Sequence, residues 1–89
     1  MGRVECMVID GLDFWFNSLD HLPYHFHARK SGWWEIRISI LECCADHLAW
    51  DMKWSKKGKG PTSREQKEIL EAVLAHRSEL VVEWSRKVR

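Results

Sequence analysis

Residues 33–41 read Trp33-Trp34-Glu35-Ile36-Arg37-Ile38-Ser39-Ile40-Leu41, and this stretch decides the fold. One face of it is apolar at every second position, with Trp34, Ile36, Ile38 and Ile40. The other face carries Trp33, Glu35, Arg37 and Ser39. Alternation with a period of two, in a segment rich in β-branched residues, predicts a β-strand with one face in the core. We expect this strand to lie at the centre of a sheet.

Four other segments show a similar alternation and predict further strands. They are residues 3–9, 12–17, 24–29 and 48–54. Asp10-Gly11 and Lys30-Ser31-Gly32 are turn signals between consecutive segments, and residues 42–46 would form a hairpin connection. The side chains that we expect to face the core are Leu12, Phe14, Phe26, Trp34, Ile36, Ile38, Trp50, Met52 and Trp54. The sheet should therefore contain four or five antiparallel strands.

After residue 61 the apolar pattern changes to the period of a helix. Thr62 and Glu65 have the spacing of a capping box, in which each side chain bonds the backbone of the other residue. Apolar residues then recur at steps of three and four as far as Val88, with an interruption at residues 76–79. Ser78 could cap a second helix, so the segment is one long helix or two helices in series. We expect a single α+β domain over residues 1–89. Its two layers are the antiparallel sheet and this C-terminal helix, which is one long helix or two in series and packs on the sheet.

Composition excludes several classes of protein. The 14 basic and 13 acidic residues give a net charge of +1, which argues against a general polyanion binder. Three cysteines, two of them adjacent, fit neither a disulfide framework nor a Cys-x-x-Cys zinc site, so we expect free thiols in a reducing cytoplasm. No apolar run approaches the ~18 residues that span a bilayer, and no membrane association is expected.

The predicted strand at residues 24–29 contains His25-Phe26-His27-Ala28, which places both imidazoles on one face and Phe26 on the core face. The polar sides of all the strands should point away from the helix and form one open polar sheet face. Its members are Asp13, His25, His27, Arg29, Glu35, Arg37, Asp51 and Lys53.

Three interpretations of the histidines follow. His25 and His27 are close enough to bind one divalent metal ion such as zinc, with His21 or Asp20 as a third ligand and an open position for water. Without a metal, His25 or His27 could act as a general base while Arg29 or Arg37 stabilises an anion. In the third interpretation the histidines form hydrogen bonds within the sheet face and have no chemical role. The third is favoured, and no cofactor is expected, because no second cluster with metal-ligand spacing accompanies them.

Two tryptophans, Trp15 and Trp33, fall on the predicted polar face, where so large an apolar surface is costly to expose. Together with Arg37 they indicate a surface that binds a protein partner or a second copy of the chain. A run of lysines could instead hold the phosphate backbone of a nucleic acid. These lysines are Lys53, Lys56, Lys57 and Lys59.

Two blocks of the sequence resemble a family of small bacterial proteins, the domain-of-unknown-function 4160 family. Asp20-His21-Leu22-Pro23-Tyr24-His25-Phe26-His27-Ala28 is similar to the family's hallmark, an acidic-His-x-Pro segment that runs into His-Phe-His-Ala. His76-Arg77-Ser78-Glu79-Leu80, with Trp84, is similar to its C-terminal His-Arg-x-Glu-Leu helix. With Ile38-Ser39-Ile40, the resemblance covers roughly residues 12–88. It implies a small cytoplasmic protein from a mobile-element, phage-related or toxin–antitoxin-like setting.

Two classes of function are consistent with these observations. The preferred one is an interaction or regulatory protein that binds a protein partner. The alternative is a small hydrolase or nuclease, with or without a metal, that uses His25 and His27 with the assistance of Arg29. The first is preferred because the chain is too short to enclose a deep pocket and lacks a complete set of catalytic residues.

Overall fold

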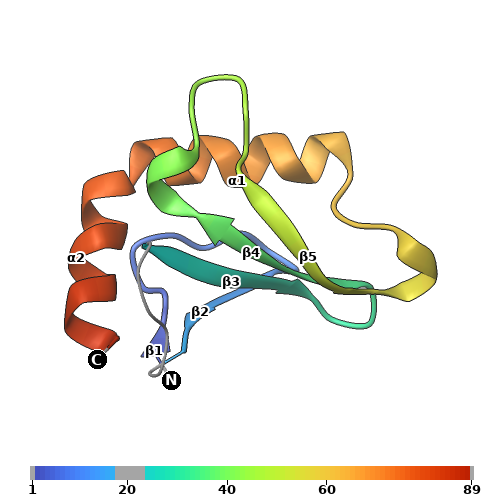
Figure 1. Ribbon diagram of the computed structural model, residues 1–89, viewed down its shortest axis with the longest axis horizontal. Helices are drawn as coiled ribbons and strands as arrows, with labels where there is room; N and C mark the ends of the chain where they lie inside the picture. Colours follow the sequence, from blue (N-terminus) through green and yellow to red (C-terminus); the bar gives the residue numbers. More distant parts are fainter. Residues whose placement is uncertain (1, 18–23, 89) are drawn as a thin grey trace.

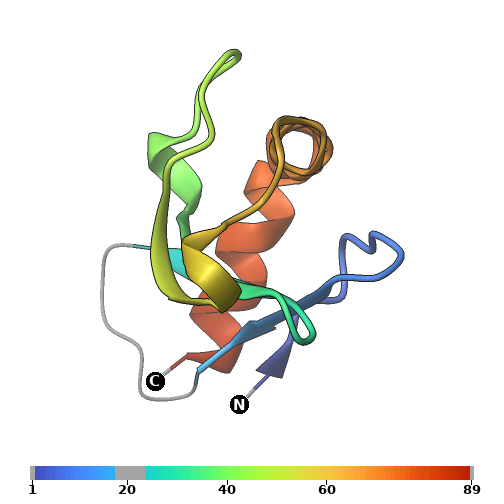
Figure 2. The same cartoon turned by 90° about the vertical axis from the view of Figure 1, so that its right-hand side faces the viewer.

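The fold is a five-stranded antiparallel sheet with two helices packed on one of its faces (Figures 1 and 2). A computed structural model describes residues 2–17 and 24–88. The strands follow one another across the sheet in chain order: β1 Gly2–Arg3, β2 Asp13–Phe16, β3 His25–Lys30, β4 Trp34–Ser39 and β5 Trp50–Ser55. The helices are α1 Ser63–Ala75 and α2 Arg77–Lys87, and short 3₁₀ turns cover Ile40–Glu42 (η1) and Lys56–Gly58 (η2). The predicted two-layer α+β class is confirmed.

The core lies between the helices and the inner face of the sheet. The strands contribute Phe14, Phe16, Phe26, Ala28, Trp34, Ile36 and Ile38, and the helices contribute Ile69, Leu70, Val73 and Leu80. Strand β4, which decides the fold, pairs with β3 on one side and with β5 on the other. Its apolar side chains therefore have a neighbouring strand on each side and lie in the middle of the inner face. The alternation in residues 33–41 therefore predicted the centre of the core correctly.

The inner face of β5 differs from the prediction. Ile36 pairs with Met52 but Glu35 pairs with Trp54, so the register shifts and Lys53 is the extra residue of a β-bulge. An extra residue reverses the alternation beyond it, and Trp54 therefore lies on the outer face of the sheet beside Glu35. Trp54 is 51% exposed and Met52, on the same edge strand, is 40% exposed. The prediction that these two side chains are buried in the core is wrong.

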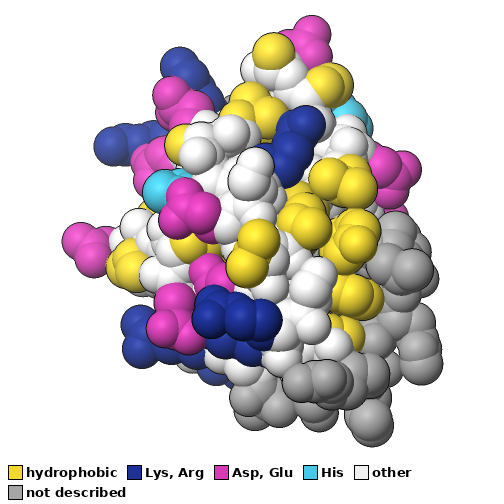
Figure 3. All heavy atoms as spheres, turned by 90° about the vertical axis from the view of Figure 1, so that its left-hand side faces the viewer, with side chains coloured by type: hydrophobic (Ala, Val, Ile, Leu, Met, Phe, Trp, Pro, Cys, Tyr) yellow, Lys and Arg dark blue, Asp and Glu magenta, His cyan; other side chains and the backbone are white. Residues whose placement is uncertain are grey.

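The N-terminal segment also differs, because Arg3 is the one residue of the predicted strand over residues 3–9 that pairs with β2, together with Gly2 before it. Beyond them, the Val4 N–H donates to the Phe14 carbonyl at 3.1 Å, and the next two amides turn away from the sheet. The N–H groups of Glu5 and Cys6 each donate to the Glu83 carboxylate of α2 at 2.8 Å. A helix side chain therefore takes the place of a strand partner for this segment. Figure 3 shows acidic and basic side chains next to one another on the side of the molecule where α2 lies.

Two helices in series, rather than one, form the second layer. Thr62 and Glu65 form the predicted capping box at the start of α1. At its end, the His76 N–H donates to the Ala72 carbonyl at 3.0 Å, and His76 leaves the helical conformation with φ −120° and ψ 20°. His76, not Ser78, is then the N-cap residue of α2. The chain turns here, and α2 runs across the end of the sheet (Figure 1).

The capping box makes the free energy of unfolding depend on pH. Burial alone would raise the pKa of Glu65, but hydrogen bonds from Lys30 and Thr62 outweigh it and hold that pKa below its ordinary value of 4.5. The folded state therefore favours the carboxylate, and this stabilisation is complete above about pH 4.5 and is lost as the pH falls through the lower folded pKa. We expect Glu65→Gln to reduce the loss of stability between about pH 6 and about pH 3, measured by urea unfolding. The exposed Glu71→Gln is the control, and an unchanged pH dependence in Glu65→Gln would contradict the assignment.

Candidate functional site

The outer face of the sheet, which the helices do not cover, carries two rows of side chains across paired strands. The first row consists of Trp15, His27, Arg37 and Asp51. The second row consists of Asp13, Arg29, Glu35 and Trp54. His25 lies beside the first row, opposite Ser39. The pairing thus brings the predicted polar residues of β2, β3 and β4, with Asp51 of β5, onto one face, as the alternation indicated. On β5 the bulge at Lys53 places Trp54 in the second row instead.

The two histidines on this face are buried. His25 is 4% exposed and His27 is 1% exposed, so the expectation that both rings lie on an open surface is wrong. The Trp15 ring stacks on the His27 ring, with 5.5 Å between centroids and 23° between planes, and the His25 ring meets His27 edge to face at 5.4 Å. The Asn17 side-chain amide lies 3.0 Å from His27 Nε2. A large aromatic neighbour, which the alternation of single strands does not reveal, covers the imidazole.

The metal interpretation of these histidines stays a prediction. It requires a third ligand beside His25 and His27, and the residues predicted for that place, His21 and Asp20, lie outside the described residues. The proposed chemistry of His25, His27 and Arg29 likewise stays a prediction. Arg29 is on the same face, but its guanidinium lies 5.4 Å from the centroid of the Trp15 ring and 3.4 Å from Asp13 Oδ2. Those contacts direct Arg29 toward β2.

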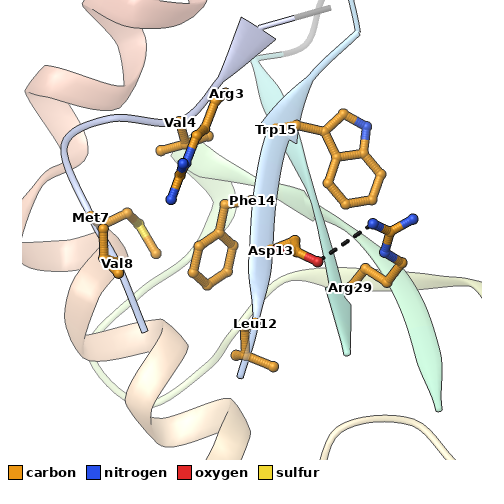
Figure 4. Close-up of a pocket in the computed structure, with 9 residues that line it drawn as sticks. All are labelled: Arg3, Val4, Met7, Val8, Leu12, Asp13, Phe14, Trp15 and Arg29. Atoms are coloured by element: carbon orange, nitrogen blue, oxygen red, sulfur yellow. Dashed lines mark hydrogen bonds and ion pairs between the residues drawn. The ribbon is translucent and has the colours of Figure 1, made fainter. Parts of the chain in front are cut away.

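An open groove of about 530 Å³ follows the edge of β2 (Figure 4). Apolar side chains lie on one side of the strand, and Asp13, Trp15 and Arg29 lie on the other. The lining residues are Arg3, Val4, Met7, Val8, Leu12, Asp13, Phe14, Trp15 and Arg29. Trp15 therefore does two things: it covers His27 and, with Arg29 over its ring, it forms a wall of this groove.

The opposite end of the sheet carries the most exposed aromatic residues. Trp33 lies in the turn between β3 and β4 and is 50% exposed, and Trp54 of β5 is exposed to the same extent. The Lys56 N–H donates to the Trp33 carbonyl at 2.7 Å, and Lys56 Nζ lies 5.3 Å from the centroid of the Trp33 ring. We call Trp33, Trp54, Lys53 and Lys56 the tryptophan–lysine surface. Trp33 was predicted here, whereas Trp54 was missed because strict alternation placed it in the core.

The remaining predicted residues are exposed or half-exposed. Lys57 and Lys59 lie next to the tryptophan–lysine surface and are exposed. Arg37 is on the outer face with its guanidinium 3.8 Å from Asp51 Oδ2, and its side chain is 40% exposed. Arg37 is therefore accessible, but it sits in the middle of the sheet and not beside Trp33.

These features define a small two-layer α+β protein, an antiparallel meander whose helix-free face is polar in the middle and aromatic at one end. A family model described as Domain of unknown function (DUF4160) matches residues 11–85, and the chain belongs to this family. The resemblance of the two sequence blocks is thereby confirmed. Searches of curated proteins and of solved structures gave no match. Within residues 2–17 and 24–88, no helix has the length and apolar character needed to cross a membrane.

Proposed function

We propose that this chain is a small cytoplasmic interaction or regulatory protein, from a toxin–antitoxin-like or phage-related setting, that binds a protein partner through the tryptophan–lysine surface. The observation that carries the proposal is the half-exposure of two tryptophans, Trp33 and Trp54, at one end of the sheet. Tryptophan is strongly enriched among the residues that dominate binding energy at protein interfaces. A small chain that leaves two of its six tryptophans half in water has a surface suited to a partner.

Lys56 supports the proposal because it orders Trp33 in advance. Its ammonium lies over the indole ring and its backbone N–H holds the Trp33 carbonyl. A side chain already held in one position loses less conformational entropy when a partner binds. The lysines around the two rings favour a partner whose own apolar pocket has acidic residues at its rim.

Recognition by side chains is better supported than extension of the sheet. Strand β5 is an edge strand, and an edge strand can pair with a strand of another chain. The bulge at Lys53 twists that edge, and a lysine on an edge strand discourages pairing with a second copy. Self-association through β5 is therefore less favoured than docking on Trp33 and Trp54.

The hydrolase or nuclease alternative has less support. A general base must come within hydrogen-bond reach of the proton it removes, and His25 and His27 are buried against Trp15 and Asn17. Packing of this kind supports a structural role for both rings. Nuclease assays of the wild type with His25→Ala and His27→Ala variants test the alternative directly.

The binding surface is tested by truncating its anchor. We expect Trp33→Ala to weaken binding of the partner by at least about 30-fold, because an interface hot spot contributes about 2 kcal/mol or more. The partner is first captured from the native cell with tagged chain, identified and purified. Its dissociation constant is then measured by calorimetry for wild type, Trp33→Ala and Trp54→Ala. Val82→Ala, an exposed apolar residue of α2, is the matched control and should leave the constant unchanged.

Two results would reject the proposed surface. One is equal affinity of the wild type and both tryptophan variants for the purified partner. The other is capture of nucleic acid instead of protein, with an affinity that falls steeply with salt, which would favour the phosphate-binding role of the lysines.

A further inference from the structure

A second constellation of reactive side chains lies where the N-terminal segment meets the junction of the two helices. Among the described residues, Cys6, His76 and Glu79 form a group whose ligand atoms, a sulfur, a ring nitrogen and a carboxylate oxygen, all lie within 4.8 Å of one another. Cys6 comes from the N-terminal segment, His76 from the junction and Glu79 from the first turn of α2. On the α2 side of the molecule, Figure 3 shows a histidine side chain next to acidic ones.

We propose that Cys6, His76 and Glu79 form a binding site for a transition-metal cation, with zinc as the preferred ion. A thiolate sulfur, an imidazole nitrogen and a carboxylate oxygen are the three protein ligands that zinc uses, with bonds of about 2.0–2.3 Å. The thiolate makes magnesium and calcium, which prefer oxygen ligands alone, poor competitors. Binding releases the thiol proton of Cys6 to the solvent.

The backbone around two of the ligands is anchored. The Cys6 N–H and the preceding Glu5 N–H both donate to the Glu83 carboxylate at 2.8 Å. The His76 N–H donates to the Ala72 carbonyl at 3.0 Å. Only modest rotation of side chains is then needed to bring the three ligand atoms to the separation of about 3.5 Å that tetrahedral zinc geometry requires. Glu79, which is exposed, is the most mobile of the three.

The third ligand is already oriented toward the second. His76 Nδ1 lies 2.8 Å from Glu79 Oε1, three residues further along the chain. A cation that binds between these two atoms replaces this contact and takes one ligand atom from each residue.

The site is accessible from solvent. A surface cavity of about 290 Å³ is lined by Cys6, Ser78, Glu79, Val82, Glu83 and Arg86. Glu83 also lines the cavity, but its carboxylate pairs with Lys87 at 3.0 Å and accepts the Glu5 and Cys6 N–H groups, so we do not count it among the ligands. Cys6 and Glu79 line this cavity, and His76 reaches the site through its contact with Glu79. Three protein ligands leave a fourth position for water, an arrangement typical of exchangeable or catalytic zinc.

The proposal is independent of the tryptophan–lysine surface, since the two share no residue. His76 and Glu79 lie within the residues that match the family, and Cys6 lies before them. The zinc site predicted at His21, His25 and His27 uses different side chains, so variants distinguish the two sites.

Cobalt(II) titration of the metal-free full chain tests the proposal. Cobalt bound to a thiolate gives charge-transfer absorption in the near ultraviolet, and zinc should displace it. We expect Cys6→Ser to abolish this absorption, and His76→Gln and Glu79→Gln to keep the absorption but weaken cobalt binding by at least about tenfold. Matched controls at exposed residues, namely Cys44→Ser, His47→Gln and Glu71→Gln, should bind as the wild type does.

The exposed Glu79 keeps the test decisive if Cys6→Ser or His76→Gln does not fold, because Glu79→Gln removes no buried group. Circular dichroism of the metal-free variants establishes which of them are folded. No thiolate absorption in the wild type, or equal cobalt affinity in folded Glu79→Gln and wild type, would overturn the proposal. So would absorption that persists in Cys6→Ser and disappears in Cys44→Ser.

Discussion

Glu83→Ala is expected to lower the free energy of unfolding by about 3 kcal/mol, because it removes the acceptor of two backbone amides and the partner of a lysine at once. Glu83 is a carboxylate of α2 that is only 4% exposed. Without it, the N–H groups of Glu5 and Cys6 lose their hydrogen bonds. Lys87 keeps its contact with Glu5, which places the loss at the lower end of the range for broken buried ion pairs.

Urea unfolding of Glu83→Ala and of the exposed Glu71→Ala measures the effect, and the control should change stability by less than about 0.5 kcal/mol. Glu83→Gln retains one acceptor oxygen and should fall between them. Burial alone would raise the pKa of Glu83, but hydrogen bonds from Cys6, the Glu5 backbone and Lys87 keep that pKa below its ordinary value of 4.5. The contribution of Glu83 is therefore present near neutral pH and is lost in acid. If Glu83→Ala lowered the free energy of unfolding no more than Glu71→Ala does, this role of Glu83 would be contradicted.

Trp34→Ala is expected to have the other large effect, a loss of about 3–5 kcal/mol that leaves so small a domain close to unfolding. Trp34 is 2% exposed on the inner face of β4, and its removal opens a cavity between the sheet and the helices. The neighbouring Trp33→Ala removes the same atoms from the turn and should change stability by less than about 0.5 kcal/mol.

Thermal unfolding, urea unfolding and partner binding are measured for both variants. Together these measurements distinguish the structural role of Trp34 from the binding role of Trp33. Trp34→Ala should lose stability, and Trp33→Ala should lose the partner while it keeps the fold. Equal destabilisation by the two substitutions would mean that the Trp33 ring packs into the protein and does not serve as a binding anchor.

Alternation in the sequence predicted the sheet and its core because both faces of β4 are determined by residues within that strand. It failed at Trp54, where one extra residue at Lys53 reverses the faces, and nothing in the local pattern marks such a bulge. It failed again at Glu5 and Cys6, because their amide partner is a side chain about 78 residues away in the sequence.

The candidate site was predicted in part for the same reason. The pairing of β2, β3 and β4 brought Trp15, His27 and Arg37 into one row, as the period of two implied. How deeply His27 is buried depends on the ring of Trp15 from another strand, which lies outside the reach of a single-strand pattern. Cys6 and His76 meet only through the packing of α2, so no spacing in the sequence indicates them.

The hydrogen bonds between Glu83 and the N-terminal segment have a consequence for folding during synthesis on the ribosome. The chain emerges from its N-terminus, but the carboxylate that fixes Glu5 and Cys6 lies 78 and 77 residues further along the sequence and is made much later. The sheet from β2 to β5 can form while the N-terminal segment is still undocked, and the segment docks only after α2 has emerged. Premature termination before Glu83 would thus leave a sheet whose first strand has no anchor and whose β2 edge is open to other nascent chains.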